Sequence, residues 1–294
     1  MRKYWFVIPA LAFLLGCKRG SMDVGRQDAE VAGTVEAETF YDTEAASSHA
    51  LEIPAPMRGV KEQIIRRKGY TVSYNRDTKI ANWVAWHLTA QRTRGNASRD
   101  NMEFTEDTSV PTPRADDWDY YNSTYDRGHL CPAGDNKWDR KAMTESFLLT
   151  NICPQNHNLN KYEWNDIEIQ CREWARQYGD VYIVTGPVFR NGVSKTIGKH
   201  KVAVPDAFFK VVLCNGNKAK AVGFLCENRG GKKKIADCLR SVDDIERMTG
   251  IDFFPALDDK TENMVEGMSK DAMSNGWQIW RIEDMKKHRN SYNR

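Results

Sequence analysis

The order of the apolar segments constrains the fold of this chain most strongly. Residues 78–88 alternate apolar side chains with smaller or polar ones, with Trp83 as the exception, and residues 181–185 form a short β-branched run. Both patterns favour strands. Residues 208–213 and 221–225 predict a hairpin, because the connection between them contains an Asn-Gly pair that accepts the positive φ of tight turns. The strands therefore come in adjacent pairs.

Helical patterns interrupt these strands at irregular intervals. Apolar side chains recur at steps of three and four along one segment and mark one face of an amphipathic helix: Trp164, Ile167, Cys171, Trp174 and Tyr178. Residues 242–249 predict a shorter helix that ends at Gly250, since glycine is common just after a helix. We therefore expect an α+β fold with a mostly antiparallel sheet rather than a repeated βαβ unit.

The first 17 residues resemble an export signal. Arg2 and Lys3 precede an apolar run at 4–15 that is too short to span a bilayer, and the sequence Leu-Leu-Gly-Cys at its end resembles a bacterial lipobox. Cys17 would then carry lipid and become the mature N-terminus, which would attach the protein to a membrane; the alternative is an ordinary secretory leader. The predicted location is thus a bacterial cell envelope, with an exported, lipid-anchored protein facing the periplasm or the cell surface.

The segment at 18–57 is predicted to be a flexible tether. Eight acidic residues lie between Asp23 and Glu52, and only Arg26 opposes them, so the segment has too little apolar surface to offset the entropy of ordering. We assign the remainder, residues 58–294, to one globular domain.

Charge and cysteine content exclude several classes of protein. With 43 basic and 40 acidic residues, the bulk charge does not predict nucleic-acid binding, so any such site must depend on local clusters. The seven cysteines form no C-x-x-C pair, which argues against a zinc ribbon. In an exported protein they could form bridges, and Cys214 and Cys226, which flank the predicted hairpin, are the first candidates.

Three short motifs carry most of the chemical information. They are Asp126-Arg127-Gly128-His129, Thr150-Asn151-x-x-Pro154-Gln155 and Asn160-x-x-x-Trp164-x-x-x-Glu168. Taken singly, each has a structural explanation. His129 could be an ordinary hydrogen-bonded histidine, Glu168 a solvated helix residue, and Asn160 a helix N-cap with Glu163 completing a capping box.

In this order and at these intervals, the motifs resemble the DNA/RNA non-specific endonuclease family, which includes secreted bacterial nucleases and mitochondrial endonuclease G. Other stretches also resemble blocks of this family: residues 81–85, 98–100, 184–187, 204–210 and 243–250. The resemblance extends over about residues 70–257. It implies a ββα-metal finger set in a central antiparallel sheet with flanking helices, with His129 on a finger strand and Asn160 at the start of the finger helix.

The resemblance also implies roles for individual residues. His129 is the expected general base, because a neutral imidazole can accept a proton from water. Asn160 is expected to ligate Mg²⁺, or alternatively Mn²⁺ or another divalent cation, through its carbonyl oxygen. Glu168 lies eight residues further on, about 12 Å along a helix, so we expect it to hold a metal-bound water rather than the ion.

Two arginines and two amides complete the predicted site. Arg127 and Arg99 match the family's functional arginines, whose planar guanidinium groups would stabilise charge on the phosphoryl oxygens. Asn151 and Gln155 match positions that orient active-site groups, so we expect supporting roles for them.

The expected substrates are DNA and RNA. The sequence contains no zinc-finger spacing and no aromatic readout motif, so recognition should depend on the phosphate backbone with little base preference. Basic residues outside the motifs are candidate phosphate contacts or simply a solvated basic face: Lys195, Lys199, His200, Lys201 and residues 232–234. Two other functions stay open: a catalytically silent polyanion-binding lipoprotein of the same fold, and a phosphodiesterase for small nucleotides. A homodimer is also left open.

Overall fold

The computed structural model describes residues 50–230 and 234–277. The predicted leader at 1–17, including Cys17, and the tether up to residue 49 lie outside the described residues, so these assignments stay predictions. In the described part of the chain, no helix combines the length and the apolar composition that crossing a membrane requires.

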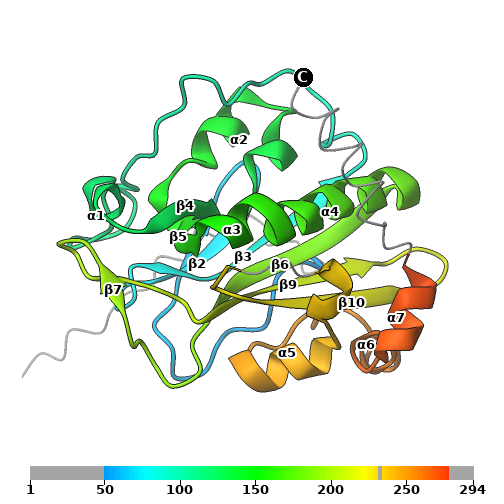
Figure 1. The fold of residues 1–294 in the computed structure, drawn as a ribbon. Helices are drawn as coiled ribbons and strands as arrows, with labels where there is room; N and C mark the ends of the chain where they lie inside the picture. Colours follow the sequence, from blue (N-terminus) through cyan, green and yellow to red (C-terminus); the bar gives the residue numbers. More distant parts are fainter. Residues whose placement is uncertain (1–49, 231–233, 278–294) are drawn as a thin grey trace, which may run out of the picture. The chain divides into compact units, whose positions relative to one another are not determined.

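A seven-stranded antiparallel sheet forms the centre of the fold (Figure 1). In spatial order its strands are β1 (Gln63–Arg66), β2 (Thr71–Asn75), β3 (Ile80–Thr89), β6 (Asp180–Val188), β9 (Ala207–Cys214), β10 (Lys220–Glu227) and β11 (Leu239–Arg240). The β3 and β6 strands and the β9–β10 hairpin coincide with the predicted strands, and β6 is the central one. The predicted α+β class is therefore confirmed.

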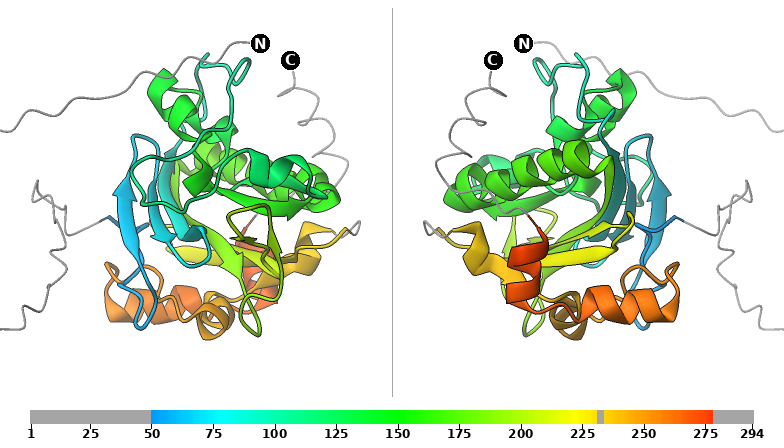
Figure 2. Two further views of the ribbon diagram at one scale, coloured as in Figure 1. Left: turned by 90° about the vertical axis from the view of Figure 1, so that its left-hand side faces the viewer. Right: turned by 90° about the vertical axis from the view of Figure 1, so that its right-hand side faces the viewer.

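Helices cover both faces of this sheet (Figures 1 and 2). α4 (Asn165–Tyr178) lies over one face, and α5 (Val242–Thr249) and α6 (Asp259–Glu266) lie over the other. α4 and α5 are the two predicted helices, and α5 ends at Gly250, which has a positive φ of 70°. The sheet therefore separates two hydrophobic cores, an α4-side core and an α5-side core.

Strand residues alternate between these two cores, as the period of a strand requires. In β9, Phe208 and Val212 belong to the α4-side core, whereas Phe209 and Val211 belong to the α5-side core. Trp83, which broke the alternation in the sequence, is buried in the α5-side core. A sheet covered on both faces has no polar side, and this is why the pattern of β3 is incomplete.

A second, two-stranded sheet leads into the long helix. β4 (Tyr125–His129) pairs antiparallel with β5 (Ile152–Asn156), and the chain continues through α3 (His157–Leu159) and a π turn, η3 (Asn160–Trp164), into α4. This is the predicted ββα arrangement, with His129 on its first strand. The remaining elements are α1 (Trp118–Tyr121), η1 (Ala133–Asn136), α2 (Arg140–Glu145), η2 (Leu149–Asn151), β7 (Thr196–Ile197), β8 (Val202–Ala203), η4 (Ile235–Cys238) and α7 (Lys270–Gly276).

The folded unit begins before the predicted boundary at residue 58. Leu51, Ile53 and Met57 pack against the α5-side core, and the backbone N–H of Ala55 donates to the carbonyl of Asp252 at 3.0 Å. Residues 50–57 therefore pack on the domain instead of belonging to a tether. These apolar residues stand singly in the sequence, so no period marks them as part of the core.

The predicted bridge between Cys214 and Cys226 is wrong. In the β9–β10 ladder Cys214 pairs with Lys220 and Cys226 pairs with Phe208, so the two cysteines lie at opposite ends of the hairpin. The separation is roughly 20 Å along the strands, far beyond the reach of a disulfide. The thiol of Cys226 instead forms a hydrogen bond with Cys238.

Candidate functional site

A cavity of about 620 Å³ lies beside the ββα unit and joins residues that are far apart in the sequence. Five of the predicted site residues line it: Arg99, Arg127, His129, Asn160 and Glu168. They come from the loop before α1, from β4 and from the continuous helical segment η3–α4. The predicted catalytic and metal-binding groups therefore face one common space.

His129 lies at the end of β4, with its ring against two aromatic side chains. The ring centroid is 5.4 Å from that of Phe104 and 5.0 Å from that of Phe147. Its Nε2 is buried and has no hydrogen-bond partner among the described residues. Burial, followed by the positive charge of Arg99, lowers the pKa of His129 from 6.5 to about 3. The imidazole is therefore neutral at physiological pH and can accept a proton.

Asn160 is not the helix N-cap that the sequence suggested. Asn156 occupies that position, and its side-chain oxygen accepts hydrogen bonds from the backbone N–H groups of Asn158 and Leu159 at 3.0 and 3.4 Å. Asn160 lies four residues further along, within continuous helical backbone. The sequence offers two asparagines that could cap this helix, and only the backbone geometry distinguishes them.

The side chain of Asn160 is held by Asp126. The amide nitrogen of Asn160 donates to a carboxylate oxygen of Asp126 at 2.9 Å, and the same oxygen lies 3.0 Å from Nδ1 of His157. The carbonyl oxygen of Asn160 accepts no hydrogen bond from the described residues. It is therefore available to a ligand in the cavity.

A π turn places Asn160 and Glu168 on the same side of the helix. In a regular α-helix, eight residues turn through about 800°, so the two side chains would point about 80° apart. One turn of α-helix takes about 3.6 residues. In a π turn the backbone bonds join residues five apart, so that turn takes about one residue more than an α turn. One turn of each kind uses about eight residues. The π turn at Asn160–Trp164 thus rotates Glu168 back toward the cavity that Asn160 lines.

Glu168 is a half-buried carboxyl group that forms no hydrogen bond or ion pair with the described residues. Burial raises its pKa from 4.5 to about 7, and the positive charges of Lys210 and Arg172 oppose this increase. The group therefore titrates near neutral pH and presents oxygen atoms that accept no hydrogen bond from the described residues.

Lys210 is a buried cation that the sequence analysis missed. It lies in β9 with no exposed surface, and its Nζ has no hydrogen-bond partner among the described residues. The ammonium group lies over the rings of Trp86 and Trp164, at 5.0 and 4.5 Å from their centroids. A lysine in the middle of an apolar strand was the signal in the sequence, since a fully buried lysine is rare.

Arg172 also lines the cavity and was missed. Its Nη1 donates to a carboxylate oxygen of Asp135 at 2.8 Å, and the other oxygen of Asp135 accepts from the indole of Trp86 at 3.0 Å. Arg172 follows Glu168 by four residues, so the helical period alone places the two side chains on one face.

Arg127 extends from β4 toward α1. Its guanidinium group forms an ion pair with the carboxylate of Asp117, the N-cap residue of α1, and lies over the rings of Phe104 and Tyr120. Arg99 lies over the ring of Phe147, 5.8 Å from its centroid. Both arginines are therefore held beside His129 by aromatic side chains.

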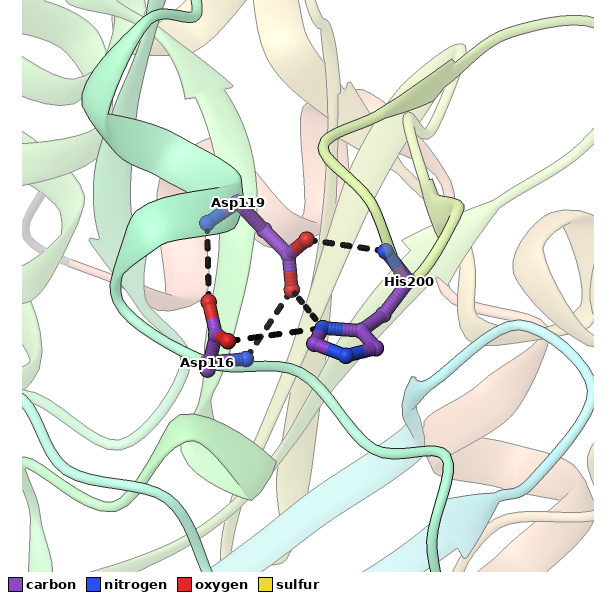
Figure 3. A group of neighbouring side chains, drawn as sticks. All are labelled: Asp116, Asp119 and His200. Atoms are coloured by element: carbon purple, nitrogen blue, oxygen red, sulfur yellow. Dashed lines mark hydrogen bonds and ion pairs between the residues drawn. The ribbon is translucent and has the colours of Figure 1, made fainter. Parts of the chain in front are cut away.

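A cluster of two carboxylates and a histidine fixes the position of α1 (Figure 3). The backbone N–H of His200 donates to one oxygen of Asp119 at 2.9 Å, and Nδ1 of His200 lies 3.0 Å from the other. Asp116 and Asp119 also accept each other's backbone N–H groups, at 3.1 and 2.9 Å. The loop between β7 and β8 is thereby held against the helix whose N-cap binds Arg127.

In the described part of the chain, the other basic residues proposed as phosphate contacts do not line the cavity. Lys195 donates to the hydroxyl of Tyr125 at 3.0 Å, and His200 belongs to the cluster just described. Lys199 and Lys201 are exposed on the same loop, and residues 232–233 lie outside the described residues.

Asn151 and Gln155 lie behind the cavity wall. The buried amide of Asn151 donates to the carbonyls of Cys131 and Ser146, both at 2.8 Å, and accepts the N–H of Cys131 at 2.9 Å. Gln155 packs against the backbone of Gly128, where an added Cβ would come within 2.4 Å of its side-chain oxygen. Both positions can support the loop around His129, but neither faces the cavity.

Comparisons with known proteins agree on one family. The family model for the DNA/RNA non-specific endonucleases matches residues 49–260. One solved structure, the EndoG/EndoGI complex, superposes with a TM-score of 0.64 and 28% sequence identity, covering 68% of this chain and 89% of that one.

Curated relatives include animal and fungal nucleases. The chain is 38% identical over 218 residues to "Nuclease EXOG, mitochondrial" of Danio rerio, covering 68% of this chain and 64% of the relative. It is 36% identical over 209 residues to "Endonuclease G, mitochondrial" of Homo sapiens, covering 66% and 70%. It is 34% identical over 219 residues to "Nuclease C1" of Cunninghamella echinulata var. echinulata, covering 69% and 87%. The match spans less than two thirds of the length of the EXOG relatives.

These relatives correct the predicted location. The lipobox-like sequence at Cys17 led us to expect an exported bacterial protein that is lipid-anchored to the cell envelope. The animal relatives are mitochondrial nucleases by name, which contradicts that expectation. The expectation rested on the leader alone, which is a processing segment separate from the folded domain that the relatives share.

Proposed function

Because this chain belongs to the DNA/RNA non-specific endonuclease family, we propose that it is a metal-dependent endonuclease that hydrolyses phosphodiester bonds in both DNA and RNA. One observation carries the proposal: a histidine, two arginines and two oxygen ligands that accept no hydrogen bond from the described residues line the same cavity. Phosphodiester hydrolysis needs a proton acceptor, positive charge for the phosphoryl oxygens and help for the leaving oxygen.

His129 is the proposed proton acceptor. Its pKa of about 3 keeps the ring neutral in the free protein, because the ring is buried and Arg99 disfavours a second positive charge. A bound phosphodiester would offset the charge of Arg99 and so increase the basicity of the ring at the moment it is needed. The ring then accepts a proton from the attacking water.

The oxygen donors in the cavity fit a hard divalent cation. The carbonyl of Asn160 would ligate the ion, and the carboxylate of Glu168 would hold one of its waters; Mg²⁺ is the first choice and Mn²⁺ the second. When bound, the cation would neutralise charge on the scissile phosphate and the leaving oxygen. Asp126 orients Asn160 by binding the amide nitrogen, which leaves the carbonyl oxygen for the ion.

The two arginines would bind the phosphoryl oxygens. Arg127 is held by Asp117 and Arg99 by the ring of Phe147, so both are positioned in advance beside His129. Guanidinium groups stay charged at any physiological pH and can follow the charge that builds up in the pentacoordinate state. Their contacts are with phosphate, so the proposal includes little base preference.

A degradation assay tests this function. Plasmid DNA and RNA should both be cleaved in MgCl₂, and EDTA should stop the cleavage. His129→Ala should lower the rate by about 10² to 10⁴ while the melting temperature stays close to that of the wild type. His87→Ala, which removes a half-buried imidazole outside the cavity, is the matched control and should retain activity. Normal cleavage by His129→Ala would contradict the assignment, and binding of DNA without any cleavage by the wild type would favour the silent polyanion binder.

A further inference from the structure

Two groups of side chains in the described residues have the spacing of a metal site. In the first, Asp116, Asp119 and His200, the carboxylates already accept hydrogen bonds from backbone N–H groups and pair with the imidazole (Figure 3). Protein donors satisfy these oxygens, so the group needs no ion.

The second group lies between α5 and α6, on the face of the sheet opposite α4 (Figures 1 and 2). We call it the α5–α6 carboxylate cluster; it consists of Asp243, Glu246 and Glu266. One carboxylate oxygen from each residue lies within 4.8 Å of the others. Asp243 is exposed, Glu246 is half-buried and Glu266 is buried, so the cluster extends from solvent into the protein.

Glu266 has no partner for its charge in the part of the chain that the structure describes. Its side chain is only 7% exposed, and Oε1 is buried without a hydrogen-bond partner among the described residues. It is also the last residue of α6, where the negative end of the helix dipole disfavours a carboxylate. A buried, unpaired carboxylate is costly, so a residue in this position points to a bound cation.

The neighbouring groups that act on Glu266 are negatively charged. Within the described residues, no lysine, arginine or histidine forms an ion pair with the three carboxylates, and Arg247 pairs with Asp244 instead. Asp252 and Glu262 are close enough to act on Glu266 as further negative charges. Burial, followed by the carboxylates of Glu246, Glu262, Asp243 and Asp252, raises the pKa of Glu266 to about 8.

Glu246 is already oriented for ligation. One of its oxygens accepts the backbone N–H of Phe253 at 2.7 Å, which holds the carboxylate at the end of α5. Asp243, one helical turn earlier, is the exposed member through which an ion could enter from solvent. Three carboxylate oxygens within 4.8 Å of one another, one of them at the surface, suit Ca²⁺ better than Mg²⁺, because Mg²⁺ demands near-ideal octahedral geometry.

We propose that the α5–α6 carboxylate cluster binds a divalent cation of the Ca²⁺ type, with Asp243, Glu246 and Glu266 as oxygen ligands. The ion joins α5 to α6 and stabilises this side of the sheet. It is separate from the cavity of His129, which lies on the other face, and the proposal does not rest on nuclease activity.

Calcium titration of the full chain tests the proposal. The background variant is Asn160→Ala/Glu168→Gln, because it removes the oxygen donors of the nuclease cavity. Calorimetry on this variant should detect one Ca²⁺ with a Kd on the order of 10⁻⁴ M, and 10 mM CaCl₂ should raise its melting temperature by about 5 °C. Absence of both signals would overturn the proposal.

Substitutions in the cluster locate the ion. Adding Glu266→Gln should abolish the calcium shift, and without calcium it should raise the melting temperature at pH 8, because it removes an unpaired buried charge. If this variant fails to fold, Asp243→Asn at the exposed ligand should weaken calcium binding at least tenfold. Asp259→Asn removes an equal charge from α6 outside the cluster and should keep the full shift. A calcium shift that survives both cluster substitutions would place the ion elsewhere and refute the site.

Discussion

The side-chain amide of Asn160 donates a 2.9 Å hydrogen bond to the carboxylate of Asp126. Asp126, in the first motif, therefore orients Asn160, the first residue of the third motif. This contact decides which end of the carboxamide faces the cavity. It also gives Asp126 a positioning role that requires no direct part in the reaction.

Removing Asp126 should weaken metal binding more than it affects catalysis at saturating metal. In Asp126→Ala the carboxamide of Asn160 is free to rotate, and the half-saturating Mg²⁺ concentration should rise by about 10-fold or more. Asp126→Asn keeps an acceptor oxygen and should give a smaller change. Cleavage rates measured against Mg²⁺ concentration test this, and an unchanged metal dependence in Asp126→Ala would show that Asn160 does not need this partner.

Helix capping and metal binding should depend on two different asparagines, Asn156 and Asn160. Asn156→Ala removes the N-cap and should cost about 1 kcal/mol, which lowers the melting temperature by about 2–4 °C. Asn160→Ala should leave the melting temperature nearly unchanged and abolish most metal-dependent cleavage, because its side chain caps nothing. Thermal melts in EDTA beside rate measurements in MgCl₂ distinguish the two, and a loss of stability in Asn160→Ala alone would contradict the backbone geometry described here.

The pH dependence should come from Glu168 and not from His129. The pKa of Glu168 is raised to about 7, so its carboxylate forms as the pH rises through neutrality, whereas His129, with a pKa of about 3, stays neutral throughout. At low Mg²⁺ the cleavage rate should therefore increase with pH up to about 7. This rise on the acidic side of the pH–rate profile, the acidic limb, should move to lower pH as the Mg²⁺ concentration increases, because the cation competes with the proton for Glu168. The Glu168→Gln variant should show no acidic limb. A limb that persists in Glu168→Gln would assign it to another group.

Lys210 should determine the pH at which the acidic limb of the rate profile occurs. It is the largest positive influence on Glu168, so Lys210→Met should move the acidic limb to higher pH, while Lys210→Arg, which keeps the charge, should leave it nearly in place. Lys210→Met should not destabilise the fold, because an apolar side chain of similar length replaces a buried ammonium that has no hydrogen-bond partner among the described residues. Rate profiles at fixed, low Mg²⁺ together with melting curves measure both effects.

Features that depend on local pattern could be predicted from the sequence. The strand β3, the strand β6 and the β9–β10 hairpin follow from an alternating pattern, a β-branched run and an Asn-Gly turn, and α4 and α5 follow from a 3.6-residue period and a glycine stop. Each of these signals lies within its own segment. The three motifs likewise indicated the family and four residues that line the cavity, Arg127, His129, Asn160 and Glu168, because a short motif can be recognised without knowledge of the fold.

Only the tertiary structure decided how those residues act. The π turn that aligns Glu168 with Asn160 depends on which backbone hydrogen bonds form in the folded protein. In the sequence, the pattern of residues 160–168 is that of an ordinary α-helix. Lys210 and Glu266 are buried because helices cover both faces of the sheet, and burial is a property of the packed neighbours and not of a residue's own segment. Neighbours from distant segments, such as the hydrogen-bonded pair Asp126 and Asn160 and the clustered carboxylates of Glu266 and Asp243, leave no periodic pattern in the sequence, so only the folded structure reveals them.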